Sequence, residues 1–126
     1  MEQGYLVDTN IFIAYFNRTL PENGMALIEG GLPCISVITR IELLGWTLIS
    51  EEEVKMISSF LSDVIVFSLS EPIIIKTIAL RQSLKIKTPD AIIAATALTH
   101  NLTLLTRNTS DFKQIPELNS VNPFEL

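Results

Sequence analysis

Short, wholly apolar segments alternate along this chain with longer segments that have helical periodicity. Turn or helix-capping residues follow the short segments, so we expect these segments to be β-strands, at 5–7, 34–36, 64–67, 102–106 and 120–121. Strands that are apolar on both faces and separated by helices predict a parallel sheet covered on both sides. The sequence therefore predicts an α/β fold with a central parallel sheet of four or five strands.

Capping residues place the helices between these strands. Thr9 or Asn10 is expected to cap the first helix. Ser50 caps a helix whose first turn carries three glutamates, and Thr88 caps one with Pro89 at its first position. The first expected helix runs to about residue 16, and a short second one ends at residue 29. The third covers 37–49, and the fourth follows Ser50. The last two run from residue 72 to about 84 and from residue 89 to about 100.

Composition limits the class of protein. The 126 residues, taken as one domain over 1–126, are 48% hydrophobic, which predicts elements buried on more than one side. No segment reaches the roughly 18 uncharged apolar residues of a spanning helix. Met1-Glu2-Gln3 carries no basic run, so no signal peptide is expected. The single cysteine, Cys34, reads as a small buried side chain and suits a reducing cytosol, so we expect a cytoplasmic protein.

Four acidic side chains fall where parallel sheets place ligands, just beyond the carboxyl ends of strands. Asp8 directly follows the first strand, and Asp111 follows the fourth by a short loop. Glu42 and Asp90 lie in the first two turns of helices that enter from the same edge. Taken singly, Asp8 and Asp111 read as turn residues and Asp90 as an acid that favours its helix dipole.

Glu42 carries the strongest single signal. In the helix expected over 37–49, Ile38, Ile41, Gly45 and Ile49 share one face, and Glu42 falls on the margin of that face. A carboxylate turned toward a core is costly unless it is paired or binds a metal.

Together the acids match the needs of a divalent cation. Mg²⁺ and Mn²⁺ prefer oxygen ligands and keep several waters, so a few converging carboxylates suffice. Such a cation activates water and neutralises a phosphate. His100 lies at the far end of its helix from Asp90 and is expected to interact with the last helical carbonyls. Histidine-based acid–base catalysis and a nucleophilic triad are therefore not expected.

Four segments, in order, resemble the PIN domain, and specifically the VapC-like toxins of bacterial and archaeal toxin–antitoxin pairs. They span nearly the whole chain and are Leu6-Val7-Asp8-Thr9-Asn10-Ile11, Ile41-Glu42-Leu43-Leu44-Gly45, residues 89–97, and Leu105-Thr106-Arg107-Asn108 followed by Asp111-Phe112. The resemblance implies a three-layer α/β/α sandwich, Mg²⁺- or Mn²⁺-dependent endoribonuclease activity on RNA, homodimers, and neutralisation by a cognate antitoxin.

The same resemblance implies the site residues. Asp8, Glu42, Asp90 and Asp111 match the acidic catalytic and metal-binding positions of the family. The positions that match supporting polar residues are Asn10, Thr106 and Asn108. Thr106 and Asn108 are expected to orient a carboxylate or a bound water, and plain loop polarity explains Asn108 equally well.

The net charge of −5 argues against a nucleic-acid binder when taken alone, although cations at the four acids would offset it. It favours an alternative, a PIN-like binding module that acts by complexing a protein partner, which the four intact acids oppose. A phosphoryl-transfer or receiver-type domain is disfavoured, because it needs a second aspartate where Asn10 stands or a lysine where Thr106-Arg107 stands.

Two surface features stay open. Five basic residues near the acids predict either a phosphate-binding rim or scattered solvated charges: Arg40, Lys85, Lys87, Arg107 and Lys113. Leu43 and Trp46 form a second apolar stripe on the 37–49 helix. This stripe predicts either a homodimer or antitoxin contact, or burial against the following helix.

Overall fold

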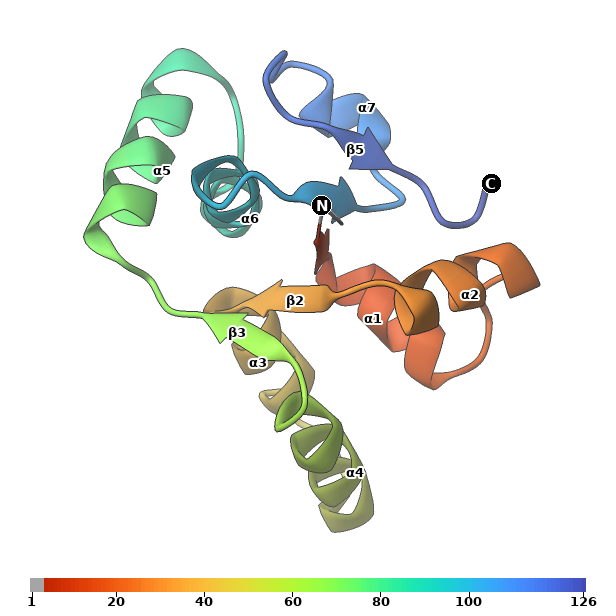
Figure 1. Ribbon diagram of the computed structural model, residues 1–126. Coiled ribbons are helices and arrows are strands. Elements are labelled where there is room, and N and C mark those ends of the chain that lie inside the picture. Colours follow the sequence, from red (N-terminus) through yellow and green to blue (C-terminus); the bar gives the residue numbers. More distant parts are fainter. Residues whose placement is uncertain (1–3) are drawn as a thin grey trace.

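The computed structural model describes residues 4–126, so Met1-Glu2-Gln3, where no signal peptide is expected, lies outside the described residues. The strands form one parallel sheet in the order β3-β2-β1-β4-β5 (Figure 1). They are β1 (Tyr5–Val7), β2 (Pro33–Ser36), β3 (Ile65–Phe67), β4 (Thr103–Leu105) and β5 (Ser120–Val121). The predicted α/β class and parallel sheet are confirmed, with the two-residue β5 as the fifth strand.

Helices cover both faces of this sheet, which gives three layers (Figure 1). Within the described range they are α1 (Thr9–Phe16), α2 (Glu22–Gly30), α3 (Val37–Leu44), α4 (Glu51–Leu61), α5 (Glu71–Ser83), α6 (Thr88–Thr99) and α7 (Thr109–Phe112). In the view of Figure 1, α1–α4 lie below the sheet and α5–α7 above it. None of the helices in residues 4–126 has the length and apolar character needed to cross a membrane.

The strand order reverses between β1 and β4. The chain moves outward from β1 to β2 and β3, then crosses over to β4 and β5 on the other side of β1. In sheets of this kind the reversal opens a crevice at the carboxyl ends of the two strands, and ligands bind there. The residues just after β1 and β4 therefore occupy the position that favours a site.

Adjacent residues of the three central strands point to opposite faces, as the pleat requires. In each strand, the first residue of such a pair packs against α5–α7, and the second packs against α1–α4 on the opposite face. The two sets, all buried, are Leu6, Cys34 and Leu104, and Val7, Ile35 and Leu105. Each burial stabilises the fold by about 1.5–3 kcal/mol for a large apolar side chain, which is why these short strands are apolar throughout.

Helix α6 is buried along residues 91–97, between α5 and the sheet. The small side chains of Ala94, Ala95 and Ala97 allow this close approach, as the sequence predicts. Thr96 is tolerated inside because its hydroxyl donates a hydrogen bond to the Ile92 carbonyl at 2.7 Å. The start of α6, which carries Asp90, is therefore part of a rigid, deeply packed element.

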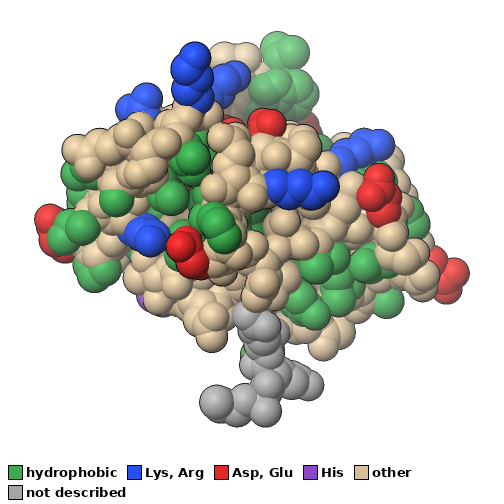
Figure 2. Space-filling view, turned by 90° about the horizontal axis from the view of Figure 1, so that it is seen from above, with side chains coloured by type: hydrophobic (Ala, Val, Ile, Leu, Met, Phe, Trp, Pro, Cys, Tyr) green, Lys and Arg blue, Asp and Glu red, His purple; other side chains and the backbone are tan. Residues whose placement is uncertain are grey.

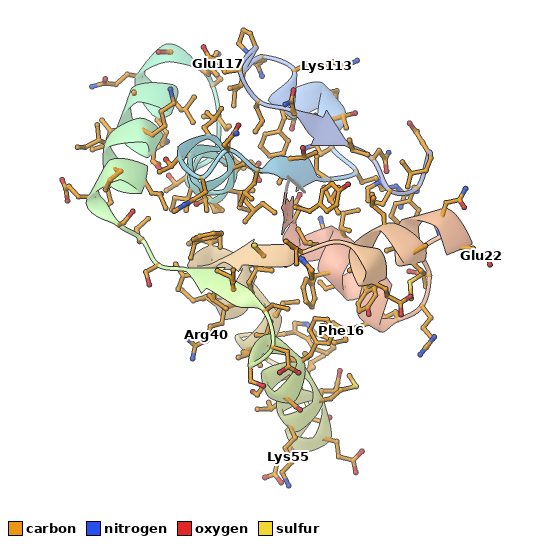
Figure 3. The ribbon with its side chains drawn as sticks, viewed as in Figure 1. Phe16, Glu22, Arg40, Lys55, Lys113 and Glu117 are labelled. Atoms are coloured by element: carbon orange, nitrogen blue, oxygen red, sulfur yellow. The ribbon has the colours of Figure 1, made fainter. Side chains whose placement is uncertain are left out.

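An aromatic cluster joins α1 to α4 on the other side of the sheet. The Phe16 ring lies between the two helices (Figure 3), with its centroid 4.9 Å from that of Phe12 and 5.3 Å from that of Phe60. Tyr15 completes the cluster, 5.6 Å from Phe60. Tilted and edge-on pairs of this kind stabilise the packing beyond their buried area. The capping box that the sequence predicts at Ser50 also starts α4.

The predicted helix over 37–49 is wrong at its end. Helix α3 stops at Leu44, and the Gly45 N–H donates to the Ile41 carbonyl at 2.7 Å. A Cβ atom on Gly45 would lie 2.6 Å from that carbonyl oxygen, so only glycine fits this tight closure.

The core face predicted for this helix is wrong for Ile41, although Ile38 is half-buried against the core. Thr39 and Leu43 are buried, whereas Ile41 is 60% exposed. Ser36 ends β2 and caps α3 by accepting a hydrogen bond from the Ile38 N–H. That fixed start sets the rotation of the helix about its axis. Thr39 and Leu43, four residues apart, therefore face the core, and Ile41 does not. Leu43, 5% exposed, is consequently core and is not available as an exposed interface residue.

The prediction that His100 interacts with the last helical carbonyls is confirmed for its backbone alone. Its ring stacks on Phe67, with centroids 4.0 Å apart and planes 20° apart, and only its backbone N–H bonds to helical carbonyls. Cys34 is confirmed as a free, buried thiol, and burial raises its pKa.

Candidate metal centre

Asp8 connects the sheet to the first helix. Its N–H extends the β1–β4 ladder by donating to the Leu105 carbonyl at 3.0 Å. Its Oδ1 accepts from the Thr9 N–H at 2.8 Å, so Asp8 itself caps α1, one residue before the predicted caps. Its Oδ2 accepts from the Thr106 hydroxyl at 2.9 Å. The strand-end carboxylate is thus held between the two strands that flank the topological reversal.

Burial raises the pKa of Asp8 above its usual value, and the hydrogen bonds from Thr106 and Thr9 oppose that rise. The nearby charges of Asp90 and Glu42 raise this pKa further. The carboxylate therefore sits in a place where a negative charge is disfavoured unless a cation joins it.

Glu42 reaches the same edge from the second turn of α3. Its Oε1 accepts from the Thr9 hydroxyl at 2.8 Å, and the Thr39 hydroxyl lies in hydrogen-bond contact with Thr9 at 3.0 Å. Glu42 is exposed, so the expectation that it turns toward the core is wrong. Rotation of α3 presents the buried Thr39 to the core instead, and this hydroxyl and Thr9 link Glu42 to the end of β1.

Asp90 lies in the first turn of α6. The cap of this helix is Lys87 rather than Thr88, so Pro89 is its second residue and not its first. Burial raises the pKa of Asp90, and the charges of Asp111 and Glu42 raise it further while Lys87 lowers it. Among residues 4–126 the Asp90 carboxylate accepts no hydrogen bond from the protein.

Asp111 lies on the four-residue α7, after the loop that follows β4. Its Oδ2 accepts from the Asn108 side-chain amide at 2.7 Å. The Asn108 N–H in turn donates to the Thr106 hydroxyl oxygen at 3.1 Å. Thr106 and Asn108 therefore do orient carboxylates, Thr106 at Asp8 and Asn108 at Asp111.

Asn10 is placed differently. Its side chain makes no hydrogen bond to the four acids in the described part of the chain, and it lines a separate cavity with Asn17 and Arg107. Its predicted support of the acidic site stays a prediction. The buried hydroxyls of Thr9 and Thr39, by contrast, were not predicted as site groups, and Thr9 was expected only as a helix cap. The signal that could have found them is polarity at positions otherwise suited to the core.

The four acids form one electrostatically coupled group, in which Asp8 and Asp90 each interact with Glu42 and with each other, and Asp111 joins through Asp90. In residues 4–126, however, no three acidic, histidine or cysteine side chains lie close enough to hold an ion by themselves. These residues fit Mg²⁺ or Mn²⁺, because such ions keep several waters and need only one or two direct carboxylates. They do not suit zinc, since Cys34 is in the core and His100 stacks on Phe67.

The basic residues near the site do not form one rim. Arg40 on α3 and Lys113 after α7 lie far apart on different sides of the molecule (Figure 3). On the face seen in Figure 2, the Lys and Arg side chains stand singly or in small groups with acidic side chains between them. Lys87 is the base whose charge reaches Asp90.

Comparison with known proteins agrees with this geometry. Residues 5–118 match the model of the PIN domain. The chain is 29% identical to "Ribonuclease VapC" of Rickettsia bellii (strain RML369-C), over 91% of this chain and 92% of that protein.

Solved structures extend the likeness. A toxin–antitoxin complex from Klebsiella pneumoniae holds a chain that is 36% identical, with a TM-score of 0.80 over 98% of this chain and 100% of that one. VapBC2 from Rickettsia felis, bound to a DNA fragment from its promoter, is 28% identical, with a TM-score of 0.77 over 94% and 97% of the two chains. With the parallel sheet, the acids at its reversal point and a family match over nearly its full length, this chain belongs to the PIN domain family.

Proposed function

We propose that this chain is the toxin of a toxin–antitoxin pair, a metal-dependent endoribonuclease that hydrolyses RNA phosphodiester bonds in the cytoplasm. The observation that carries the proposal is the coupled group of acids at the reversal point, where the charge of Asp90 raises the pKa of Asp8 and the charge of Glu42 raises the pKa of both. The relative named Ribonuclease VapC and the toxin–antitoxin complexes among similar structures support the activity and the pairing.

Asp8 and Asp90 are the proposed ligands of Mg²⁺ or Mn²⁺, with Glu42 completing the group and Asp111 acting at a second ion or through water. Such an ion would neutralise charge on the scissile phosphate and lower the pKa of water. Thr106 and Thr9 hold Asp8 and Glu42 in fixed orientations, and Asn108 holds Asp111. This hydrogen bonding reduces the reorganisation needed when substrate arrives.

The activity is tested by incubating structured RNA with Mn²⁺, with and without EDTA. We compare the parent, Asp90→Asn and the control Asp63→Asn, which makes the same change at an exposed position beyond the end of α4. Parent and control should cleave, whereas EDTA or Asp90→Asn should reduce the rate by more than about 100-fold, since even a residue that only supports a ligand is worth roughly 10–100-fold. Activity that survives both changes contradicts the assignment, and a parent that binds a partner but never cleaves supports the binding module instead.

The proposed antitoxin surface is the Trp46 groove, a cavity of about 500 Å³ between α1, α3 and α4. Its apolar wall includes Ile13, Trp46 and Met56, and Trp46 is 54% exposed. Glu42 is part of the same wall, so a partner seated in the groove reaches the acidic group directly. Occupation of this groove therefore couples binding of an antitoxin to loss of activity.

The proposed homodimer uses a different surface. Ile75 and Ile78 are three residues apart on α5 and both more than half exposed, on the other face of the sheet from the groove. A second copy seated on α5 leaves the Trp46 groove free for an antitoxin. Sedimentation of Ile78→Glu and Trp46→Asp separates the two roles: only Ile78→Glu should yield monomers. Dimer loss in Trp46→Asp alone would move the homodimer to the groove.

A further inference from the structure

A second cavity is lined by residues that follow Asp8 and Thr106 closely in the chain, and its walls have a chemistry different from that of the Trp46 groove. The Arg107 pocket, about 240 Å³ in volume, is lined by Asn10, Ile13, Asn17, Thr19, Arg107 and Phe124. We propose that it binds one base of the single-stranded RNA substrate next to the scissile phosphate, and that Arg107 is the residue on which this base stacks. The inference rests on the proposed function and names a substrate-binding role for residues outside the acidic group.

Two residues of the pocket, Asn10 and Arg107, are close in the chain to residues that form the acidic group. Asn10 is two residues after Asp8, so their Cα atoms are at most about 7 Å apart. Arg107 directly follows Thr106, whose hydroxyl bonds to Asp8. The pocket thus opens from the same two strand ends that position the acids, and its occupant is a neighbour of the group bound at Asp8.

The Arg107 side chain is already stacked on one aromatic ring. Its guanidinium carbon lies 4.1 Å above the centre of the Phe124 ring. The Phe124 backbone N–H donates to the Asn122 side chain at 2.9 Å, and its half-buried side chain packs against the core. Stacking on Phe124 holds the guanidinium flat, and Arg107 is exposed, so its opposite face is open to a second planar group.

The carboxyl-terminal segment is built to stay where it supports Arg107. It passes back from β5 toward α1 and α2 (Figure 1). A Cβ atom on Gly24 of α2 would lie 2.5 Å from the Pro123 carbonyl oxygen, so glycine is required there for the segment to pack. This explains a glycine inside a helix, where it is otherwise unfavourable.

The remaining walls suit the edge and face of a base. The side chains of Asn10 and Asn17 make no hydrogen bond within residues 4–126; Asn10 and Ile13 lie on α1, and Asn17 caps its end. The Thr19 hydroxyl donates to the Ala14 carbonyl and keeps its lone pairs as acceptors. Recognition of single-stranded RNA uses this combination: a flat surface for stacking, and amides for the base edge.

A double-mutant cycle tests the pocket with RNA hexamers in Mn²⁺, intact or with one abasic ribose at each position in turn. The partner variant is Arg107→Lys, which keeps the positive charge but loses the planar surface. In the parent, one abasic position should lower kcat/KM roughly 10-fold or more, mainly through KM. The same abasic position should lower the kcat/KM of Arg107→Lys only slightly. The control Arg81→Lys, the same change on α5, should lose as much kcat/KM at that position as the parent does.

Additive effects of Arg107→Lys and every abasic site would overturn the pocket. So would an equal loss on all hexamers, which would show that Arg107 contacts a phosphate. A parent that cleaves structured RNA but no intact hexamer also overturns the pocket and leaves the proposed nuclease standing, whereas a parent that cleaves neither substrate removes both proposals.

Discussion

The end of β1 and the start of α6 each contribute one central carboxylate, and the protein treats the two differently. Asp8 accepts hydrogen bonds on both of its oxygens, from Thr9 and Thr106. Asp90 accepts none within the described chain, and only the Lys87 charge lowers its pKa. Both pKa values are raised, first by burial and then by neighbouring acids.

This difference separates two tasks. The hydrogen bonds at Asp8 fix its orientation and favour its anionic form, which suits a ligand that must be in place before a cation arrives. Asp90 sits on the rigid, buried α6 with its charge uncompensated, which suits a ligand whose favourable partner is the cation itself. We therefore expect substitution of Asp8 and of Asp90 to change Tm differently without metal, and to abolish the stabilisation by metal alike.

The largest expected effect is on metal binding. Mn²⁺ at about 100 times its Kd should stabilise the parent by about 2.7 kcal/mol, a rise in Tm on the order of 10 °C. Asp8→Asn and Asp90→Asn should each abolish the rise, because each removes a ligand charge. Thermal unfolding followed by circular dichroism at increasing Mn²⁺ measures it, with Asp63→Asn as the matched control. A parent whose Tm ignores Mn²⁺ would count against the metal centre.

A smaller effect is expected from Thr106→Val, which keeps the shape of the side chain but removes the donor to Asp8. Cleavage should fall by roughly 10-fold, in the range usual for residues that orient a metal ligand. The pKa of Asp8 should rise further, because the Thr106 hydrogen bond lowers it. The acid limb of the pH–rate profile should therefore move to higher pH. An unchanged profile would mean that Thr106 does not control Asp8.

The smallest effect distinguishes the two acids without metal. In EDTA at pH 7, Asp90→Asn should raise Tm, by about 2 °C, because it removes a repelled charge that has no hydrogen bond. Asp8→Asn should not raise it, since its amide cannot accept from both Thr9 and Thr106. Equal shifts in the two variants would show that Asp8 and Asp90 do not differ in this way.

The pH dependence of that last effect follows from the sign of the pKa shift. The folded pKa of Asp90 lies above the usual 3.8, so the folded state binds more protons than the unfolded one between the two values. The charge of Asp90 thus costs nothing below about pH 3.8 and destabilises increasingly as pH rises through the folded pKa. The Tm advantage of Asp90→Asn should accordingly vanish at low pH and grow toward neutrality.

Much of the fold and of the candidate site was predictable because the relevant signals are local. Apolar runs flanked by turns identify strands, and a chain of such strands joined by helices has a parallel sheet. Asp8, Asp90 and Asp111 are at strand ends or in first helical turns, so the rule for parallel sheets places them at one edge without coordinates. That they would act as metal ligands, and that 1–126 works as one domain, stay predictions.

The predictions that the structure contradicts concern the rotation of α3. For α3 the sequence offers two apolar stripes, and which one meets the sheet depends on how Ser36 ends β2. Glu42 is therefore exposed, contrary to expectation, and Leu43 is buried, which is one of the two outcomes that the sequence left open. The side chain of Asn10 lines the Arg107 pocket, and its support of the acidic site stays a prediction.

The sequence by itself determined the fold class, the parallel sheet and the edge at which the acids gather, since burial and strand direction follow from residue pattern. Only the tertiary structure decided which groups meet: Thr106 with Asp8 across 98 positions, Thr9 with Glu42 across 33, and Arg107 with Phe124. Contacts between distant residues depend on helix rotation and side-chain direction. Those are set by packing of the whole chain, because no local stretch contains both partners.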